Sequence, residues 1–190
     1  PVSGNVRRPF DNNFWLTQET VNGHSVPFDY DDDGLLIESG ALAIDRDADN
    51  GLVTGTTQQG VTGTRTHNPF GELAARTVDI GSNTTYDIQY TRDKLGRIVE
   101  ETETIAGETT TRAYDYDPAG RLTEVRADGT PVHLYRYDNN GNRISHTGPA
   151  GTRTGDYDGQ DRLVAHGDAT YTHTPAGERA TKTTPEGEVT

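Results

Sequence analysis

Tyr116-Asp117-Pro118-Ala119-Gly120-Arg121-Leu122 is the stretch that decides the fold, because variants of it recur along the chain. One copy follows at residues 137–144 (YDNNGNRI), and another precedes it at residues 90–98 (YTRDKLGRI). Each copy reads as an aromatic residue, usually an acid, a few polar turn residues, a glycine, and then an arginine and an aliphatic residue. The glycines at 96, 120 and 141 are 24 and 21 residues apart, a spacing typical of repeat architectures.

Degenerate copies extend the pattern toward both ends of the chain. Residues 157–163 (YDGQDRL) place Asp161 where glycine stands elsewhere, and residues 171–179 (YTHTPAGER) form a last unit. The sequence therefore predicts these structural repeat positions: Tyr30, Gly34, Gly51, Gly71, Tyr90, Gly96, Arg97, Tyr116, Asp117, Gly120, Arg121, Tyr137, Asp138, Gly141, Arg143, Tyr157, Arg162, Tyr171, Gly177 and Arg179.

Each residue type in the repeat has a physical reason to be there. Glycine takes the left-handed backbone that a tight or bulged turn needs, and the preceding Asp or Asn can bond its own backbone and hold the bend. Tyrosine can bury a ring between neighbouring units while its hydroxyl finds a partner. The arginine after glycine can lay its stem along such a ring and reach the acid of the adjacent repeat.

The segments between these turns predict strands. Residues 85–90 (TYDIQY) alternate apolar and polar side chains, as a half-buried strand does. Asn22-Gly23 predicts a tight hairpin after a strand at residues 14–21, and Ala106-Gly107 and Asp128-Gly129 close later hairpins. Residues 72–80 are read as a strand despite Leu73-Ala74-Ala75. The predicted fold is all-β, with antiparallel hairpin repeats forming a coiled, spiral sheet.

The predicted domain organisation is continuous. Residues 1–27 form a lead-in segment and first hairpin, and residues 28–190 form the repeat array, the two together making one domain. The chain begins at Pro1 and contains no methionine, so we expect a fragment or a processed segment of a longer protein.

The composition limits both the core and the partners. Only 30% of the residues are hydrophobic, so the core must be thin, but nine tyrosines at regular offsets from the turns favour order over disorder. A net charge of -13 repels phosphates, so neither nucleic acid nor an anionic membrane is an expected partner. The chain has no cysteine, which excludes disulfides and thiolate metal sites, and no apolar run approaches the length of a membrane span.

The Tyr-Asp…Gly-Arg-aliphatic units resemble the YD repeats of bacterial Rhs proteins, insecticidal toxin-complex subunits and animal teneurins. The resemblance covers the chain from about Phe28 onward. It implies a β-strand spiral that closes into a hollow shell, which in the bacterial members encloses a C-terminal toxin, so this chain would be a strip of shell wall. The self-cleaving Asp-Pro-x-Gly-Leu motif of the family is approached at Asp117-Pro118-Ala119-Gly120, but Arg121 stands where leucine should, and no protease activity is predicted.

Other chemistry finds little support in the sequence. Residues 29–34 (DYDDDG) and 45–49 (DRDAD) imitate the start of a calcium loop, but Gly40 and Thr56 occupy the twelfth positions, where a bidentate acid is required. Acidic turn residues in water are the favoured interpretation, and weak calcium binding stays open. No serine has the setting of an activated nucleophile, and the histidines lack ligand spacing; these are His24, His67, His133, His146, His166 and His173. We therefore predict no catalytic, cofactor-binding or metal-binding residues, and no enzyme.

Two functions from different classes remain. The first is a structural YD-repeat segment of an encapsulating or scaffolding β-shell, or of a self-associating assembly, from a secreted or surface bacterial Rhs-type protein. Its partners would be neighbouring YD repeats of the same or another chain and an enclosed toxin polypeptide. The alternative is an extracellular adhesin module that binds carbohydrate or a receptor. Tyr86, Tyr116 and Tyr137 discriminate: burial between units favours the wall, and an open aromatic groove favours binding of a glycan.

Overall fold

The computed structural model describes residues 4–189, and every regular element in that range is a β-strand. None of these residues forms a helix long and apolar enough to cross a membrane. The prediction of an all-β fold built from antiparallel hairpins is confirmed. The chain divides into two units, one comprising residues up to Thr91 with Thr102–Thr109, the other Arg92–Glu101 with the chain from Thr110 onward.

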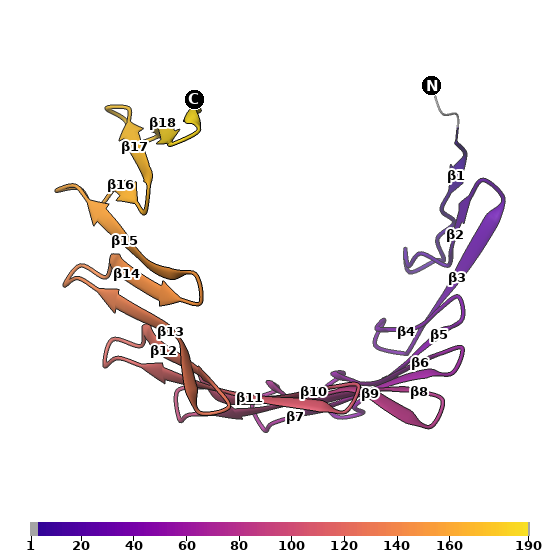
Figure 1. Cartoon of the computed structure of the whole chain (residues 1–190). Helices are drawn as coiled ribbons and strands as arrows, with labels where there is room; N and C mark the ends of the chain where they lie inside the picture. Colours follow the sequence, from indigo (N-terminus) through magenta and orange to yellow (C-terminus); the bar gives the residue numbers. More distant parts are fainter. Residues whose placement is uncertain (1–3, 190) are drawn as a thin grey trace. The chain divides into compact units, whose positions relative to one another are not determined.

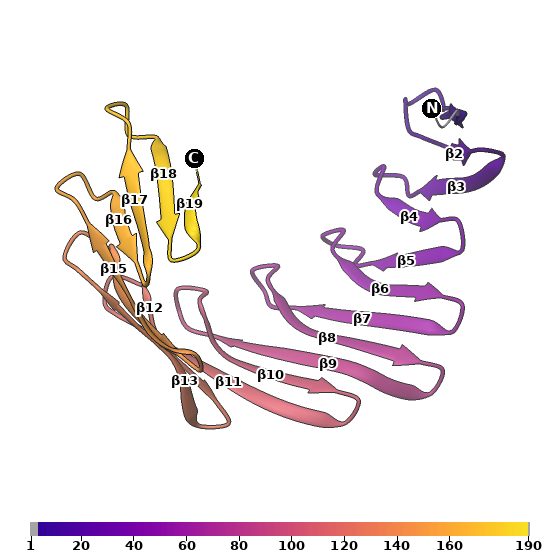
Figure 2. The same cartoon turned by 45° about the horizontal axis from the view of Figure 1, so that its top comes forward.

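In the first unit each strand pairs antiparallel with the next along the chain; Figure 1 shows β2 to β6 in this order, and Figure 2 shows the order continuing to β9. Its strands are β1 (Val6–Arg7), β2 (Gln18–Val21), β3 (His24–Tyr30), β4 (Leu36–Ser39), β5 (Leu42–Arg46), β6 (Val53–Gln58), β7 (Val61–His67), β8 (Leu73–Ile80) and β9 (Asn83–Arg92, which ends one residue beyond the unit). Two strands contribute residues to both units, β10 (Ile98–Ile105) and β11 (Glu108–Tyr116).

In the second unit the same succession of hairpins runs from β11 onward; Figure 1 shows β12 to β16 in chain order, and Figure 2 shows β16 to β19. The remaining strands are β12 (Leu122–Ala127), β13 (Thr130–Tyr137), β14 (Arg143–Gly148), β15 (Gly151–Tyr157), β16 (Leu163–His166), β17 (Ala169–His173), β18 (Arg179–Thr184) and β19 (Gly187–Val189).

Two kinds of turn alternate along the chain. One is a short hairpin turn, and both of its residues have positive φ at Asn22-Gly23 (51° and 86°), Ala106-Gly107 (51° and 90°) and Asp128-Gly129 (49° and 78°). These are the values of a type I′ turn, whose twist matches that of the flanking strands. The other is a wider turn that follows a β-bulge, and it carries the Tyr-Asp…Gly pattern.

The sheet has little interior. The buried hydrophobic side chains in the described part of the chain are Ile88, 5% exposed, and Val125, 7% exposed. Most other apolar side chains are half-buried or exposed, so each unit is a single layer with no second layer packed on it. The expectation of a thin core is confirmed, and the layer must depend on contacts between successive hairpins more than on apolar burial.

One predicted strand is wrong over half its length. Residues 14–21 contain a strand only from Gln18, because Phe14 has a φ of 63° and closes a turn that starts at Asp11. The strand predicted at residues 72–80 is confirmed as β8. The boundary predicted between residues 27 and 28 stays a prediction.

Candidate functional site: the aspartate turns and their links

The turn at Asp117 shows how one side chain closes a loop. The Asp117 amide donates to the Arg121 carbonyl and the Gly120 amide donates to the Asp117 carbonyl, both at 2.9 Å. The Asp117 carboxylate accepts the Arg121 amide at Oδ1 (2.9 Å) and the Arg121 Nε at Oδ2 (2.6 Å). Gly120 has a φ of 82°, which a Cβ would disfavour. The aspartate therefore satisfies the backbone donors that the bend leaves free.

The same backbone pattern recurs along both units. In each copy the amide of the first residue donates across the turn, and the amide of the left-handed residue donates back to the first residue's carbonyl. The Oδ1 atom of an Asp or Asn accepts amides of the turn as well. These copies start at Asp11, Asp31, Asp47, Asn68, Asp93, Asp138 and Asp158, and at Thr174 with the backbone bonds alone; the Asp47 copy is one residue longer.

The residue before each turn lies at a β-bulge. At Tyr116 the register shifts after Asp115, and Tyr116 pairs with Leu122 across the turn. Equivalent shifts occur before Tyr30, Tyr137 and Tyr157. Because a bulge redirects the side chain that follows it, the tyrosine leaves its own hairpin and meets the preceding one.

Tyrosine hydroxyls tie the turns at Asp31, Asp117, Asp138 and Asp158 to the turns before them. The acceptor is always the backbone carbonyl five residues after the first residue of the preceding turn. The bonds run from Tyr30 to Leu16 (3.0 Å) in the first unit, and from Tyr116 to Ile98 (2.7 Å), Tyr137 to Leu122 (2.9 Å) and Tyr157 to Arg143 (3.3 Å) in the second. A half-buried ring thus finds its polar partner in the neighbouring repeat.

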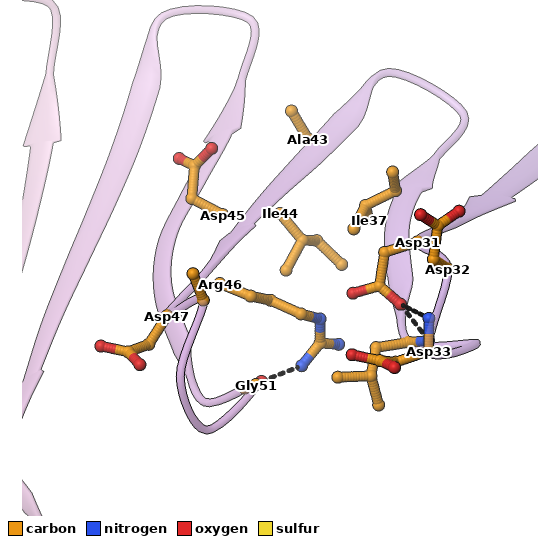
Figure 3. Close-up of a pocket in the computed structure, with 12 residues that line it drawn as sticks. Asp31, Asp32, Asp33, Ile37, Ala43, Ile44, Asp45, Arg46, Asp47 and Gly51 are labelled. Atoms are coloured by element: carbon orange, nitrogen blue, oxygen red, sulfur yellow. Dashed lines mark hydrogen bonds between the residues drawn. The ribbon is translucent and has the colours of Figure 1, made fainter.

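Arg46 replaces tyrosine before the turn at Asp47. Its Nε donates to the Leu36 carbonyl at 3.0 Å, the acceptor position that a tyrosine hydroxyl uses elsewhere. Its Nη1 donates to the Gly51 carbonyl at 2.8 Å, the bond drawn dashed in Figure 3. An arginine therefore performs the same link without a ring.

The arginines of two turns stack on the next tyrosine, as expected. The Arg97 guanidinium carbon lies 4.6 Å from the centroid of the Tyr116 ring, and that of Arg121 lies 4.8 Å from Tyr137. Arg121 Nη1 also donates to the Asp138 carbonyl at 3.1 Å. The acid that each arginine reaches is, however, that of its own turn, four residues earlier. The expected contact with the acid of the adjacent repeat is therefore present at Arg121, through the Asp138 backbone carbonyl, whereas the carboxylate that pairs with each guanidinium belongs to the arginine's own turn.

The contact between the turns at Asp138 and Asp158 has a smaller residue in the arginine position and a larger one in the glycine position. Arg97 Nη1 lies 3.4 Å from where a Cβ would stand on Gly120. In the later copy the shorter Asn142 replaces arginine, and Asp161, at a φ of 59°, replaces the glycine. The Asp161 carboxylate accepts the amides of Asn142 (2.7 Å) and Asn140 (2.8 Å). A larger residue on the glycine side thus compensates for a smaller one on the arginine side.

The carboxylates of the turns at Asp117, Asp138 and Asp158 have pKa values below their ordinary range. The Arg162 side chain and the Gln160 amide, which donate to the carboxylate, lower the pKa of Asp158 to about 2. The Arg121 amide lowers the pKa of Asp117, and the Asn142 side chain lowers that of Asp138. Hydrogen bonds to the charged form cause each shift, so these acids are ionised at neutral pH.

Some predicted repeat residues lie elsewhere in the repeat. Tyr90 and Tyr171 stand three residues before the turns at Asp93 and Thr174, whose preceding positions hold Arg92 and His173. Arg143 and Arg179 come one residue after the position that arginine holds in the Asp117 turn. The remaining predicted positions fall in or next to the turns: Tyr30, Gly34, Gly51, Gly71, Gly96, Arg97, Tyr116, Asp117, Gly120, Arg121, Tyr137, Asp138, Gly141, Tyr157, Arg162 and Gly177.

The predicted repeat positions leave out several first residues of turns. These are Asp11, Asp31, Asp47, Asn68, Asp93 and Asp158. An Asp or Asn three residues before a glycine is the signal that identifies Asp31, Asn68 and Asp93. The signal fails at Asp11, where Phe14 holds the glycine position at a φ of 63° with 85% of its surface exposed. It also fails at Asp47, whose glycine comes one residue later, and at Asp158, where Asp161 holds the glycine position.

A cavity of about 540 Å³ lies among the acidic turns of the first unit. Figure 3 shows Asp31, Asp33 and Arg46 around it. The Asp31 carboxylate accepts hydrogen bonds from the Asp33 and Leu35 amides at 3.1 and 2.8 Å. No group of three or more His, Cys, Asp or Glu side chains among residues 4–189 is placed to hold a metal ion. The acids here close turns.

Comparison with known proteins agrees with this architecture. Residues 5–182 match the family model Teneurin YD-shell. Teneurin-4 of Homo sapiens and of Mus musculus are each 28% identical over 172 residues, which cover 85% of this chain and 6% of the relative. The chain therefore spans a small part of these relatives.

Solved structures share the fold. The Photorhabdus luminescens Tc holotoxin pore carrying the TccC3-D651A mutation matches with a TM-score of 0.72 at 15% identity, over 94% of this chain and 12% of the other. The TcdB2-TccC3-TEV crystal structure matches with a TM-score of 0.67 at 10% identity, over 95% and 11%. Since the family model spans nearly all of the repeats described above, the chain belongs to the teneurin YD-shell family.

Proposed function

We propose that this chain is a segment of the wall of an encapsulating or scaffolding β-shell, and that the pairing of its hairpins is its activity. The observation that carries the proposal is the repeated link to the backbone of the preceding turn, which is made by Tyr30, Arg46, Tyr116, Tyr137 and Tyr157. Such links define a layer that extends by repetition without a second layer packed on it. A wall needs this property, and a binding module does not.

The tyrosines that discriminate between the two functions favour the wall. Tyr116 and Tyr137 are half-buried, each beneath an arginine of the preceding turn and each with its hydroxyl bonded to the backbone. Tyr86 is half-buried with the Arg76 guanidinium 5.9 Å from its ring centroid. Rings held in this way contribute to cohesion between repeats, and no observation favours glycan or receptor binding.

The finer assignments rest on family membership. We infer that the parent protein is secreted or displayed at a cell surface, that it is a bacterial Rhs-type protein, that its wall encloses a polypeptide such as a toxin, and that this segment is not catalytic. The matched solved structures bear the names of toxin complexes, which supports the first and third of these inferences.

Self-association of the isolated chain tests the role of strand pairing. β19 pairs with β18 on one side, and an unpaired strand edge is a template for another chain. We expect sedimentation velocity to show species larger than the monomer at high protein concentration. Val189→Lys, which places a charge on this strand where the side chain is 65% exposed, should restore the monomer. A chain that stays monomeric at every concentration would contradict self-association.

Imaging of the intact parent protein tests the wall itself. We expect cryo-electron microscopy to place this segment in a continuous sheet with neighbouring hairpins paired on both sides of it. A segment that projects from the particle as a separate domain, with its tyrosine-to-backbone links open to solvent, would refute the proposal.

A further inference from the structure

Two histidines on adjacent strands of the second unit point their ring nitrogens at one another. His133 lies on β13 and His146 on β14, and the register that pairs Tyr135 with His146 places all three side chains on one face of the hairpin. His133 Nδ1 and His146 Nε2 are 3.0 Å apart, and both residues are half-buried. Neither histidine takes part in the links between turns, so the wall does not explain the pair.

The surroundings hold both rings in place and leave space beside their nitrogens. The Tyr135 ring stacks on His146 with centroids 4.8 Å apart and an angle of 6° between the planes. Gly148 faces the pair: a Cβ on it would stand 2.9 Å from His133 Nδ1 and 3.2 Å from His146 Nε2. A cavity of about 190 Å³ opens next to it, lined by His133, Gly148 and Pro149 among others. A side chain at 148 would fill the space that an added ligand needs.

We propose that His133 Nδ1 and His146 Nε2 form a two-histidine site for a divalent late transition metal, Cu²⁺ or Ni²⁺. Imidazole nitrogens bind such ions at about 2.1 Å. With the nitrogens 3.0 Å apart, the angle from one nitrogen through a shared ion to the other would be about 90°. This is the angle between neighbouring ligands in the square and tetragonal geometries of Cu²⁺ and Ni²⁺, whereas tetrahedral Zn²⁺ needs a wider one.

Binding requires a change of tautomer and no change of net protonation. In the metal-free pair one facing nitrogen carries a proton and donates it to the other. When the ion binds, that proton moves through solvent to the distal nitrogen of the same ring, and both facing lone pairs become ligands. The remaining coordination positions hold water, because no third His, Cys, Asp or Glu of the described chain joins the pair.

The nearby charges set the expected affinity. Arg153 is the cross-strand partner of His146, and the Arg143 guanidinium lies 5.9 Å from the Tyr135 ring centroid. Their positive charge opposes a second cation, so the site should be weaker than a cage of carboxylates and imidazoles. A bound ion would clamp β13 to β14 and stabilise the hairpin by mass action.

Calorimetric titration of the metal-stripped chain with NiCl₂ and CuCl₂ tests the site. We expect one equivalent of each ion to bind, Cu²⁺ more tightly than Ni²⁺, with nitrogen hyperfine splitting from two equivalent ligands in the copper spectrum. His133→Ala and His146→Ala should each weaken binding by about tenfold or more, a loss of roughly 1.4 kcal/mol. His173→Ala, which removes a histidine on β17, should leave binding unchanged.

A blocking variant separates the site from other metal-binding groups. Gly148→Ala keeps both histidines, and its backbone conformation suits any residue, yet its methyl group would occupy the space beside the two nitrogens. We expect it to weaken Ni²⁺ binding as much as loss of a ligand does. Gly159→Ala is the matched control, because a Cβ there has nothing within 4 Å. Binding that survives in His133→Ala, His146→Ala and Gly148→Ala, or no binding by the wild-type chain, would overturn the proposal.

Discussion

Replacing Gly34 by alanine perturbs two features of the wall at once. Gly34 is the left-handed residue of the Asp31 turn, with a φ of 80°. A Cβ on it would lie 2.5 Å from Cζ2 of Trp15, a residue of the preceding turn. Gly177 has the equivalent place in the Thr174 turn, with a φ of 91° and nothing within 4 Å of a Cβ. Gly177→Ala therefore measures the backbone cost alone.

The magnitudes follow from these contacts. A left-handed alanine costs about 1–2 kcal/mol, which is the whole destabilisation expected for Gly177→Ala. Gly34→Ala adds the displacement of an indole ring that also packs on Tyr30, with centroids 5.4 Å apart. Overpacking of this kind costs roughly 1–3 kcal/mol. Gly34→Ala should thus destabilise by about 2–5 kcal/mol, which is about 1–3 kcal/mol more than Gly177→Ala.

Equilibrium unfolding in urea measures both variants. Trp15 is the single tryptophan of the chain, so its fluorescence reports the first unit, and far-ultraviolet circular dichroism reports the strands of both units. Gly34→Ala should lower the midpoint of the fluorescence transition, and Gly177→Ala should leave that transition in place while lowering part of the dichroism transition. The slopes should stay unchanged if the variants alter stability alone.

Equal losses of stability in Gly34→Ala and Gly177→Ala would refute the reasoning, because they would mean that Trp15 does not pack on the turn. Asp161→Gly supplies the opposite test. It relieves a left-handed aspartate but removes the hydrogen bonds to Asn140 and Asn142. The relief of the left-handed backbone, about 1–2 kcal/mol, and the loss of the two hydrogen bonds, about 1–3 kcal/mol together, should nearly cancel. A strongly stabilised Asp161→Gly would show that the two amides contribute nothing.

Three further perturbations address the links and the titrating groups. Tyr137→Phe removes a hydroxyl bond of 2.9 Å and should destabilise the second unit by about 0.5–1.5 kcal/mol in urea unfolding. The pKa of Asp158 is lowered to about 2. The stabilising effect of its carboxylate is therefore present above the unfolded-state pKa near 3.8 and is lost as the pH falls toward 2. A carboxyl-carbon NMR titration of Asp158 should give a midpoint near 2, and Arg162→Ala should raise that midpoint. Burial, followed by the Glu101 charge, raises the pKa of Tyr114 to about 12. The neutral phenol therefore stabilises the fold below pH 10, and this effect is lost as the pH rises through 12. Ultraviolet titration should show one tyrosine that ionises near pH 12, and Glu101→Gln should lower the pKa of that tyrosine.

Each of these predictions has a control or a result that would contradict it. Tyr171→Phe removes a hydroxyl on β17 outside the links between turns and should leave unfolding unchanged, so an equal effect at Tyr171 and Tyr137 would contradict the importance of the link. If Arg162→Ala leaves the Asp158 midpoint where it was, the guanidinium is not the main cause of the shift. A Tyr114 phenol that ionises near pH 10 in the folded chain would show that its site is open to water.

The turns could be predicted because their causes are local. Glycine at 34, 96 or 120 marks a left-handed residue whatever surrounds it, and Asp117 and Asp138 hold bends by bonding amides two to four residues away. The same logic failed where a side chain broke the pattern: Phe14 adopts the left-handed conformation without being glycine, so its turn was read as a strand.

The links between repeats could not be predicted, because they depend on register. The hydroxyl of Tyr116 meets the carbonyl of Ile98, 18 residues away, only because a bulge before Tyr116 shifts the pairing by one residue. Arg46 in place of tyrosine and Asp161 in place of glycine are intelligible only when the neighbouring turn is present.

By itself, then, the sequence determined an all-β chain of hairpins, the places where they turn and the family they resemble, since steric limits on φ and the alternation of side chains act within a few residues. The tertiary structure decided which backbone carbonyl each linking tyrosine bonds, which carboxylate each turn arginine pairs with, and that His133 lies next to His146. Those outcomes depend on how whole strands align, and a shift of one residue in that alignment sends every side chain to the opposite face.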